Sequence, residues 1–291
     1  MKELRGMGVA LVTPFKEDLS VDYDALERLV NYNIENGTNY LVISGTTGES
    51  VTVTKEEKQK IVETIIRVNN DRVPLVLGIG GNNTAAVIQE IKDTDLSKIT
   101  AVLSVSPYYS KPTQEGIYQH FKAISEACPV SIILYNVPGR TSKNVEPETV
   151  LRLAKDFKNI VAVKEAAGVM SQYLKLIKDK LEDFLIISGD DDLALSTTLA
   201  GGAGVISVIG QAFPKAFSSM IQHGLKGEVA EAYEIHYKFM DIISNIFEEN
   251  NPAGIKAVLE AKGICNDYVR LPLVVASENS KKRIKETISK L

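Results

Sequence analysis

Residues 40–80 read YLVISGTTGESVTVTKEEKQKIVETIIRVNNDRVPLVLGIG and contain one complete β-α-β unit. The apolar runs YLVISG and VPLVLGIG at its two ends are short and rich in β-branched residues, which predicts two buried strands. Between them, TKEEKQKIVETIIRVNN carries apolar residues at helical spacing. Strands that are apolar along nearly their whole length are typical of a parallel sheet covered by helices.

The same alternation continues on both sides of this unit. GVALVT and the amphipathic stretch DYDALERLVNYNIENG precede it, and further apolar runs alternate with helical stretches after it. The eight strand candidates are residues 8–13, 40–45, 73–80, 101–106, 130–136, 160–165, 184–190 and 204–210. Eight repeats joined by helical crossovers predict an α/β fold of the (β/α)8 TIM barrel type. A doubly wound open sheet is the alternative, but no G-x-G-x-x-G motif follows the first strand.

Beyond residue 211 the alternation stops and only helical patterns remain. They cover residues 215–225, 228–250, 253–263 and 277–291. No Ser-rich linker separates them from the preceding repeats. The prediction is therefore a barrel over residues 1–210 and a C-terminal helical region, residues 211–291, packed against it.

Composition excludes several classes of function. Of the 291 residues, 44% are hydrophobic and 24% are charged, which is typical of a globular protein with a large core. The formal net charge of -4 offers no basic field, so no nucleic-acid partner is expected. No apolar run approaches the ~20 residues of a membrane helix, and no signal-peptide core forms before Pro14. Because Cys128 and Cys265 are far apart, a reducing cytoplasm is the expected location.

The sixth strand candidate ends in a charged residue. In VAVKEAAG, which begins at Val161, alternation places Lys164 on the same side as Ala162, with Val161 and Val163 on the other side. If Lys164 faces inward, it lies at the end of the barrel where active sites are built. A partly desolvated amine loses part of its preference for the ammonium form and can form a Schiff base with a ketone. The alternative is a lysine that extends to solvent or pairs with Glu165.

The preceding strand candidate ends in a phenol, that of Tyr135 in VSIILYNVPGRT. Consecutive strands of a barrel are neighbours, so Tyr135 is expected beside Lys164. A phenol in that position can relay protons. The alternative is a tyrosine at the rim that donates to a carbonyl.

The second strand candidate ends in SGTTGES, residues 44–50. Gly45 and Gly48 permit a tight turn in which successive N–H groups face an anion. Thr46 and Thr47 add further donors. The motif lacks the G-K-[ST] ending of a P-loop, so a carboxylate suits it as well as a phosphate. The alternative is an ordinary turn capped by threonine.

Two other loops favour interface and structural roles. SPYYSKPTQEG follows the fourth strand candidate and presents Tyr108 and Tyr109, a pair of aromatics typical of an interface. The acids of SGDDD, residues 188–192, are expected to cap the next helix. Because the histidines lie in helical stretches away from the strand ends, no metal site is predicted.

Together and in this order, GTTGES, PYY, YNVPGRT, the strand-end Lys164 and SGDD resemble the dihydrodipicolinate synthase family. The family belongs to the Schiff-base aldolase superfamily, which includes N-acetylneuraminate lyase. The resemblance extends from GVALVTPF to VRLPL. It implies that pyruvate condenses with Lys164, loses a methyl proton and attacks aspartate 4-semialdehyde, so that ring closure gives 4-hydroxy-tetrahydrodipicolinate for diaminopimelate and lysine biosynthesis. No external cofactor is implied, because the lysine supplies the electron sink.

The resemblance also implies roles for individual residues. Those that match the family's proton relay are Tyr135, Thr46 and Tyr109. Those that match the family's substrate pocket are Thr47, near the pyruvate carboxylate, and the backbone positions Gly189 and Ile206. Tyr109 is expected to reach into the site of a neighbouring subunit, which implies a tight homodimer, usually within a tetramer.

Arg140, in VPGRT, favours one branch of the superfamily. A guanidinium can bind a carboxylate through two hydrogen bonds, and aspartate 4-semialdehyde has a carboxylate where a sugar aldehyde presents neutral hydroxyls. Arg140 taken alone is equally typical of a surface salt bridge. Two alternative functions remain: a sugar-acid aldolase that uses the same lysine, and a non-catalytic carboxylate-binding barrel in which Lys164 is only a charge.

Two features depart from the family pattern. Members inhibited by lysine commonly have a histidine or acid after GTTGES and a glutamate after the third strand, whereas Lys55, Lys58 and Ala86 stand here. Lys58 repels an ammonium ligand and Ala86 cannot bind one, so feedback by lysine is expected to be weak or absent, although Asn82 and Tyr108 match. The second departure is NPAGIK, which replaces the more familiar N-P-x-P-x-K.

Overall fold

The computed structural model describes residues 1–291 and contains a closed barrel of eight parallel strands. The strands are β1 (Gly6–Ala10), β2 (Tyr40–Ile43), β3 (Leu75–Gly78), β4 (Ala101–Val105), β5 (Ser131–Asn136), β6 (Ile160–Glu165), β7 (Leu185–Ser188) and β8 (Gly204–Ser207). Each strand pairs with its neighbours in sequence, and β8 pairs with β1. The predicted (β/α)8 barrel is confirmed, and a doubly wound sheet is excluded because no edge is open.

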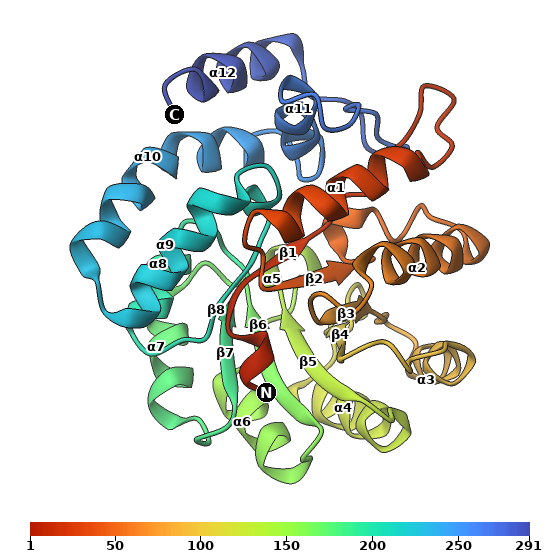
Figure 1. The fold of residues 1–291 in the computed structure, drawn as a ribbon. Coiled ribbons are helices and arrows are strands. Elements are labelled where there is room, and N and C mark those ends of the chain that lie inside the picture. The colour runs from red at the N-terminus through yellow and green to blue at the C-terminus, as the bar shows by residue number, and fades with distance from the viewer.

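Helices surround the strands as an outer layer (Figure 1). Between the strands lie α1 (Tyr23–Glu35), α2 (Lys55–Asn69), α3 (Thr84–Asp93), α4 (Gln114–Ala127), α5 (Pro138–Thr141), α6 (Pro147–Asp156), α7 (Met170–Asp179) and α8 (Ala194–Leu199). The 3-10 helices are η1 (Lys2–Leu4), η2 (Thr46–Gly48) and η3 (Ile209–Gln211). Local sequence fixes where helices begin: at α2, Thr54 and Glu57 bond each other's backbone in a capping box.

The helices after β8 are α9 (Pro214–Lys226), α10 (Val229–Phe247), α11 (Ala253–Ala261) and α12 (Glu278–Ile288). α9 contacts β1, β8 and α8, so it lies directly on the barrel, while α10 packs on α9 and α12 packs on α10 and α11. The division of the chain into a barrel that ends at residue 210 and a helical region that begins at residue 211 stays a prediction. No helix combines the length and the apolar character needed to cross a bilayer.

Alternate strand residues form two separate cores. The barrel interior is filled by Leu4, Ala10, Tyr40, Val42, Val76, Ala101, Leu103, Ile133, Tyr135, Val137, Ala162, Leu185, Ile187, Ala203 and Ile206. The opposite strand faces pack with the helices in a larger cluster. Leu4 of η1, the turn that precedes β1, belongs to the interior set, so η1 packs on the barrel at the end where the strands begin. The opposite end, where the strands finish, is the end at which barrels of this type build their sites.

The alternation along β6 is interrupted once. The pairing of β5 with β6 shifts after Ile132, so that Ile132 faces Ile160 but Ile133 faces Ala162. Val161, the extra residue, packs against the interior set beside Ala162. The prediction that Val161 lies opposite Ala162 is therefore wrong, because a bulge places two consecutive residues on one face.

Candidate active site

Lys164 and Tyr135 occupy paired positions at the ends of β6 and β5. Lys164 follows Ala162 on the interior face, whereas Val163 belongs to the outer cluster. Its side chain is buried, with 6% exposed, and its Nζ atom lies 4.4 Å from the centre of the Tyr135 ring. The sequence therefore located both side chains correctly: an amine and a phenol meet at the end of the barrel where the strands finish.

The turn predicted from SGTTGES follows β2 as η2. It is closed by a 3.1 Å hydrogen bond from the Gly48 N–H group to the Gly45 carbonyl. The N–H groups of Thr46 and Thr47 have no acceptor in the chain, so both can bind an anion. The buried Thr47 hydroxyl accepts a 3.0 Å hydrogen bond from Nδ2 of Asn251, which leaves its own O–H group to donate.

Arg140 lies in α5, a short helix directly after β5 that the sequence pattern did not indicate. Its side chain is exposed, and its Nη2 atom contacts the Asn251 carbonyl at 3.5 Å. Asn251 therefore touches both Arg140 and Thr47 from the C-terminal helical region. Arg140 forms no carboxylate salt bridge, so its guanidinium is available to a substrate.

Gly189 and Ile206 line the same region from β7 and β8. A Cβ atom on Gly189 would lie 2.7 Å from the Ala166 Cβ atom, closer than real Cβ contacts come, and would make a tight contact of 3.0 Å with the Lys164 Cε atom. Glycine therefore leaves room for the lysine side chain. Ile206 is fully buried, and its side chain belongs to the interior set.

Tyr109 is the predicted residue that the structure does not bring into this barrel. It follows β4 with a positive φ of 70°, and 90% of its side chain is exposed. Asn82 Nδ2 donates to the neighbouring Tyr108 carbonyl at 3.3 Å, which holds the loop's backbone. The Tyr109 ring is thus presented outward from its own subunit.

Comparison with known proteins agrees with this geometry. The model of the dihydrodipicolinate synthetase family matches residues 3–291. The chain belongs to this family. The resemblance seen in the sequence motifs is thereby confirmed over almost the whole chain.

Relatives in the dihydrodipicolinate synthetase family are similar over almost their full length. The chain is 58% identical over 284 residues to 4-hydroxy-tetrahydrodipicolinate synthase of Flavobacterium psychrophilum, covering 98% of this chain and 97% of the relative. The structure of Acinetobacter baumannii dihydrodipicolinate synthase complexed with pyruvate superposes with a TM-score of 0.95 at 38% identity, covering 99% and 98%. A monomeric dihydrodipicolinate synthase variant gives a TM-score of 0.96 at 40% identity, covering 99% and 97%.

Glu165, the residue after the lysine, points away from the amine of Lys164. Its carboxylate accepts hydrogen bonds from Asn136 Nδ2 at 2.9 and 3.0 Å, from Gln172 Nε2 at 3.0 Å and from the Ala167 N–H group at 2.9 Å. Burial raises the pKa of Glu165 to about 7. The alternative in which Lys164 pairs with Glu165 is therefore excluded.

The acids of SGDDD do not cap the helix that follows them, so that prediction is wrong. α8 begins after Leu193 without a side-chain cap. The buried Asp191 carboxylate instead accepts from the N–H groups of Val208, at 3.0 Å, and Ile209, at 2.9 Å, and burial raises its pKa to about 6. Asp190 accepts from the Tyr173 hydroxyl at 2.9 Å. These acids tie β7 to its neighbours, and no group of three or more His, Cys, Asp or Glu side chains is placed to hold a metal ion.

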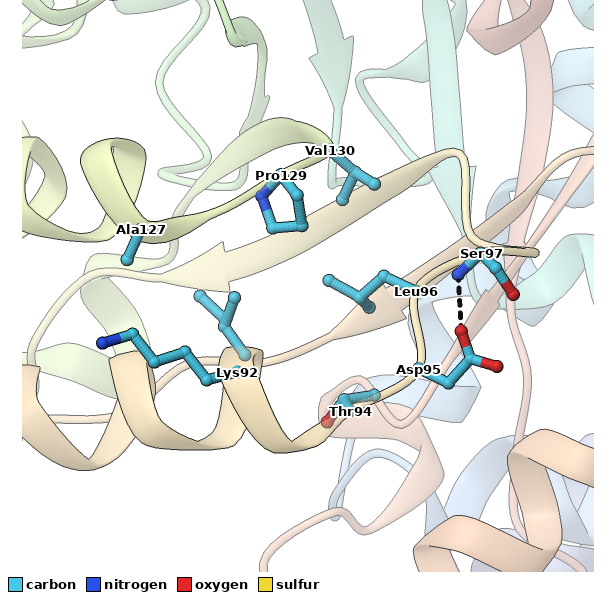
Figure 2. Close-up of a pocket in the computed structure, with 9 residues that line it drawn as sticks. Lys92, Thr94, Asp95, Leu96, Ser97, Ala127, Pro129 and Val130 are labelled. Carbon is cyan, nitrogen blue, oxygen red and sulfur yellow. Dashed lines mark hydrogen bonds between the residues drawn. The ribbon is translucent and has the colours of Figure 1, made fainter.

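A hollow of about 420 Å³ lies at the other end of the barrel (Figure 2). It is lined by Ile91, Lys92, Thr94, Asp95, Leu96, Ser97, Ala127, Pro129 and Val130. These residues precede β4 and β5, whereas Lys164 lies where β6 finishes. Since all strands are parallel, the hollow is remote from the lysine and belongs to the face that barrels use for stability.

Proposed function

We propose that the protein condenses pyruvate with aspartate 4-semialdehyde to give 4-hydroxy-tetrahydrodipicolinate, a step toward diaminopimelate and lysine, with Lys164 as the nucleophile. The family and the name of its 58% identical relative support this reaction. The observation that carries the proposal is the buried Lys164 amine 4.4 Å from the Tyr135 ring centre. A site of this kind has a nucleophile and a proton carrier but needs no external cofactor.

In the first stage, the neutral Lys164 amine adds to the keto carbon of pyruvate and water leaves, which forms an iminium ion. The positive nitrogen draws electrons from the methyl group, so a methyl proton is lost and an enamine forms. In this proposal Tyr135, whose ring contacts the amine, accepts and returns these protons, with Thr46 as the next member of the relay. The free N–H groups and hydroxyls of Thr46 and Thr47 bind the pyruvate carboxylate.

In the second stage, the enamine carbon attacks the aldehyde carbon of the second substrate and a hydroxyl forms there. The amine of aspartate 4-semialdehyde then replaces the Lys164 nitrogen at the imine carbon, which closes the ring and returns the free lysine. Arg140 binds the carboxylate of this substrate, because its exposed guanidinium uses one N–H group on the Asn251 carbonyl and keeps others free for a ligand. Gly189 and Ile206 line the pocket.

The proposal includes a homodimer in which Tyr109 completes the relay of the neighbouring subunit, usually within a tetramer. Its support is the 90% exposed ring on a strained backbone, since an exposed tyrosine of this kind fits an interface. Equilibrium sedimentation tests the assembly. A wild-type protein that is monomeric and fully active would contradict it.

We also propose a cytoplasmic location, with metabolites as the only partners besides further copies of the chain. Its support is the pair of buried free thiols, Cys128 and Cys265, which suits a reducing compartment.

Borohydride reduction in the presence of pyruvate tests the function directly. Reduction fixes a Schiff base, so peptide mass analysis of the wild type is expected to show a pyruvate adduct on Lys164. The Lys164→Ala variant is expected to show none. A wild-type protein that binds pyruvate but yields no adduct would remove the mechanism and leave the carboxylate-binding barrel as the better account.

A further inference from the structure

The C-terminal helical region reaches the loop after β2 through a fully buried ion pair. Lys256 of α11 places its Nζ atom 2.6 Å from Oε1 of Glu49, and the two side chains are 0% and 1% exposed. Glu49 directly follows η2 and has a left-handed backbone, with φ of 53°. Lysine and glutamate side chains are almost never fully buried unless they are paired, so a pair buried at a loop indicates a structural or functional role.

The Lys256 amine has two further contacts besides Glu49. Its Nζ atom donates to the Tyr268 carbonyl at 2.6 Å and lies 4.2 Å from the centre of the Phe15 ring. Burial lowers the pKa of Lys256, and the charge of Glu49 opposes that change. Removing one partner therefore leaves the other as a buried, uncompensated charge.

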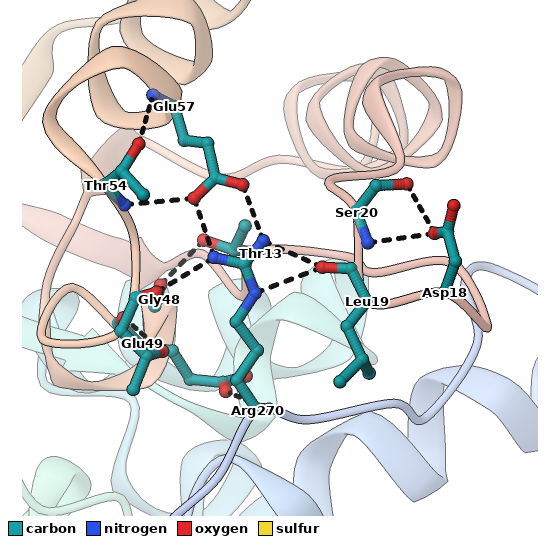
Figure 3. A network of polar contacts seen from close by, with 10 residues as sticks. Thr13, Asp18, Leu19, Ser20, Gly48, Glu49, Thr54, Glu57 and Arg270 are labelled. Carbon is teal, nitrogen blue, oxygen red and sulfur yellow. Dashed lines mark hydrogen bonds and ion pairs between the residues drawn. The ribbon is translucent and has the colours of Figure 1, made fainter.

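The second carboxylate oxygen of Glu49 accepts a 3.0 Å hydrogen bond from the backbone N–H group of Arg270. The Arg270 guanidinium binds both oxygens of Glu57, at 2.7 and 2.6 Å, and the carbonyls of Leu19 and Thr52 (Figure 3). The loop after β2 is also bound just before Glu49, where the Thr13 hydroxyl donates to the Gly48 carbonyl at 2.7 Å. These contacts fix the backbone on both sides of Glu49.

We propose that Lys256 is a positioning residue for the carboxylate-binding turn, acting through Glu49. The inference rests on the proposed function, in which Thr46 and Thr47 bind pyruvate. A non-glycine residue in the left-handed region needs its surroundings to hold it there, and Glu49 is held by its side chain. Its N–H group bonds the Thr46 carbonyl at 3.1 Å, so the conformation of Glu49 sets the orientation of the Thr46 peptide.

A second contact of the same segment points to the same role. Asn251, five positions before Lys256, donates to the Thr47 hydroxyl at 3.0 Å. The NPAGIK segment thus holds the turn at two points, Thr47 and Glu49. Neither Asn251 nor Lys256 needs to touch the substrate to affect its binding, since each acts through the turn.

The test measures how much pyruvate is needed to trap half of Lys164 with borohydride, followed by mass analysis, and compares it with the melting temperature. Lys256→Met keeps the length of the side chain but removes the charge. The double variant Lys256→Met/Glu49→Gln leaves no unpaired charge and keeps the test valid where the single variant folds poorly. Lys281→Met is the matched control, since it breaks the 2.6 Å ion pair of Lys281 with Asp267 in the same region, and neither of these residues forms a hydrogen bond or ion pair with Glu49 or η2.

We expect the folded Lys256 variants to need at least tenfold more pyruvate, whereas Lys281→Met stays within twofold of the wild type. Lower melting temperatures with an unchanged pyruvate requirement would overturn the positioning role and leave Lys256 as a purely structural residue. A wild type that forms no adduct would overturn the proposed function, and with it this inference. The two failures are therefore distinguishable.

Discussion

Lys164 and Tyr135 face each other across neighbouring parallel strands, and the lysine amine lies 4.4 Å from the centre of the phenol ring. The two side chains leave the barrel wall side by side, and both are buried. Because the strands fix both Cα positions, the amine and the ring meet without help from a mobile loop. The roles of these residues can therefore be tested one atom at a time.

Tyr135→Phe removes one oxygen and keeps the ring that contacts Lys164. We expect kcat to fall by about 10²–10⁴-fold, the usual contribution of a positioned acid or base. The melting temperature should change little, because the ring still fills its place in the interior set. Steady-state kinetics and thermal unfolding check both statements. A kcat within threefold of the wild type would remove Tyr135 from the relay.

Arg140→Ala is expected to raise KM for aspartate 4-semialdehyde by about tenfold or more, the loss of a charged hydrogen-bonded contact. Pyruvate trapping on Lys164 should be unchanged, since the Arg140 guanidinium contacts only the backbone carbonyl of Asn251, whereas it is the Asn251 side chain that binds Thr47 of η2. Arg140→Lys retains the positive charge but loses the planar set of N–H donors, so its KM should lie between those of the wild type and Arg140→Ala. Kinetics that do not respond to either change would instead favour a sugar-acid aldolase.

Gly189→Ala introduces a Cβ atom 2.7 Å from Ala166 and 3.0 Å from the Lys164 Cε atom. We expect it to lower the free energy of unfolding by about 1–3 kcal/mol, as overpacking does, and to slow adduct formation. Gly81→Ala is the control, because its added carbon would make only an ordinary 3.5 Å contact with Val87. Equal behaviour of the two variants in denaturant titration and trapping would contradict the expected crowding.

Glu165→Gln should alter how stability depends on pH. Burial raises the pKa of Glu165 from its ordinary value of 4.5 to about 7. Between these values the folded protein binds more protons at this position than the unfolded chain, so the stability that the protonated group contributes at low pH is lost as pH rises toward 7. The wild type should therefore lose up to about 1.4 kcal/mol per pH unit relative to the variant in this window.

Denaturant titrations of both proteins from pH 4.5 to 7 measure that difference. Asp191 titrates in both proteins, so its contribution cancels in the comparison, whereas Asp190, whose charge also raises the pKa of Glu165, is coupled to it and the difference therefore reports the pair. Parallel curves for the two proteins would show that the pKa of Glu165 is the same in the folded and unfolded states, which contradicts the expected shift.

Lysine is expected to inhibit weakly or not at all. Lys58 places a cation after the turn; its Nζ atom pairs with Glu90 at 2.5 Å and donates to the Gly78 carbonyl at 2.8 Å. Ala86, at the start of α3, has no group that binds an ammonium ion. An inhibition curve with both substrates near KM checks this, and half-inhibition at sub-millimolar lysine would contradict it.

Sequence patterns were sufficient to predict the features that depend on neighbouring residues and on the order of the strands along the chain. Apolar periodicity located all eight strands, and the rule that consecutive barrel strands are neighbours placed Tyr135 beside Lys164. The bulge at Val161 could not be read in this way, because the pairing of β6 with β5 decides which residue is extra. Asp191 was misinterpreted for a similar reason: its partners, Val208 and Ile209, lie just after β8, where Ile209 begins η3.

Pairs that are distant in sequence escaped prediction altogether. Glu49 reads as one more polar residue of a loop, and its partner lies 207 positions away. The one signal was Lys256 itself, a charge within the apolar stretch AGIKAVLEA. A lysine in an apolar run drew attention to Lys164 for the same physical reason.

The separation of Glu49 from Lys256 also bears on how the protein is made. A ribosome completes all eight strands before it reaches residue 256, so Glu49 has no counter-ion until the C-terminal helical region has been synthesised. A polypeptide that stops after β8 would carry the nucleophile and the phenol but would lack Lys256 and Arg270, the two residues that bind the Glu49 carboxylate. Completion of the binding site is thus tied to the last part of the chain to be synthesised.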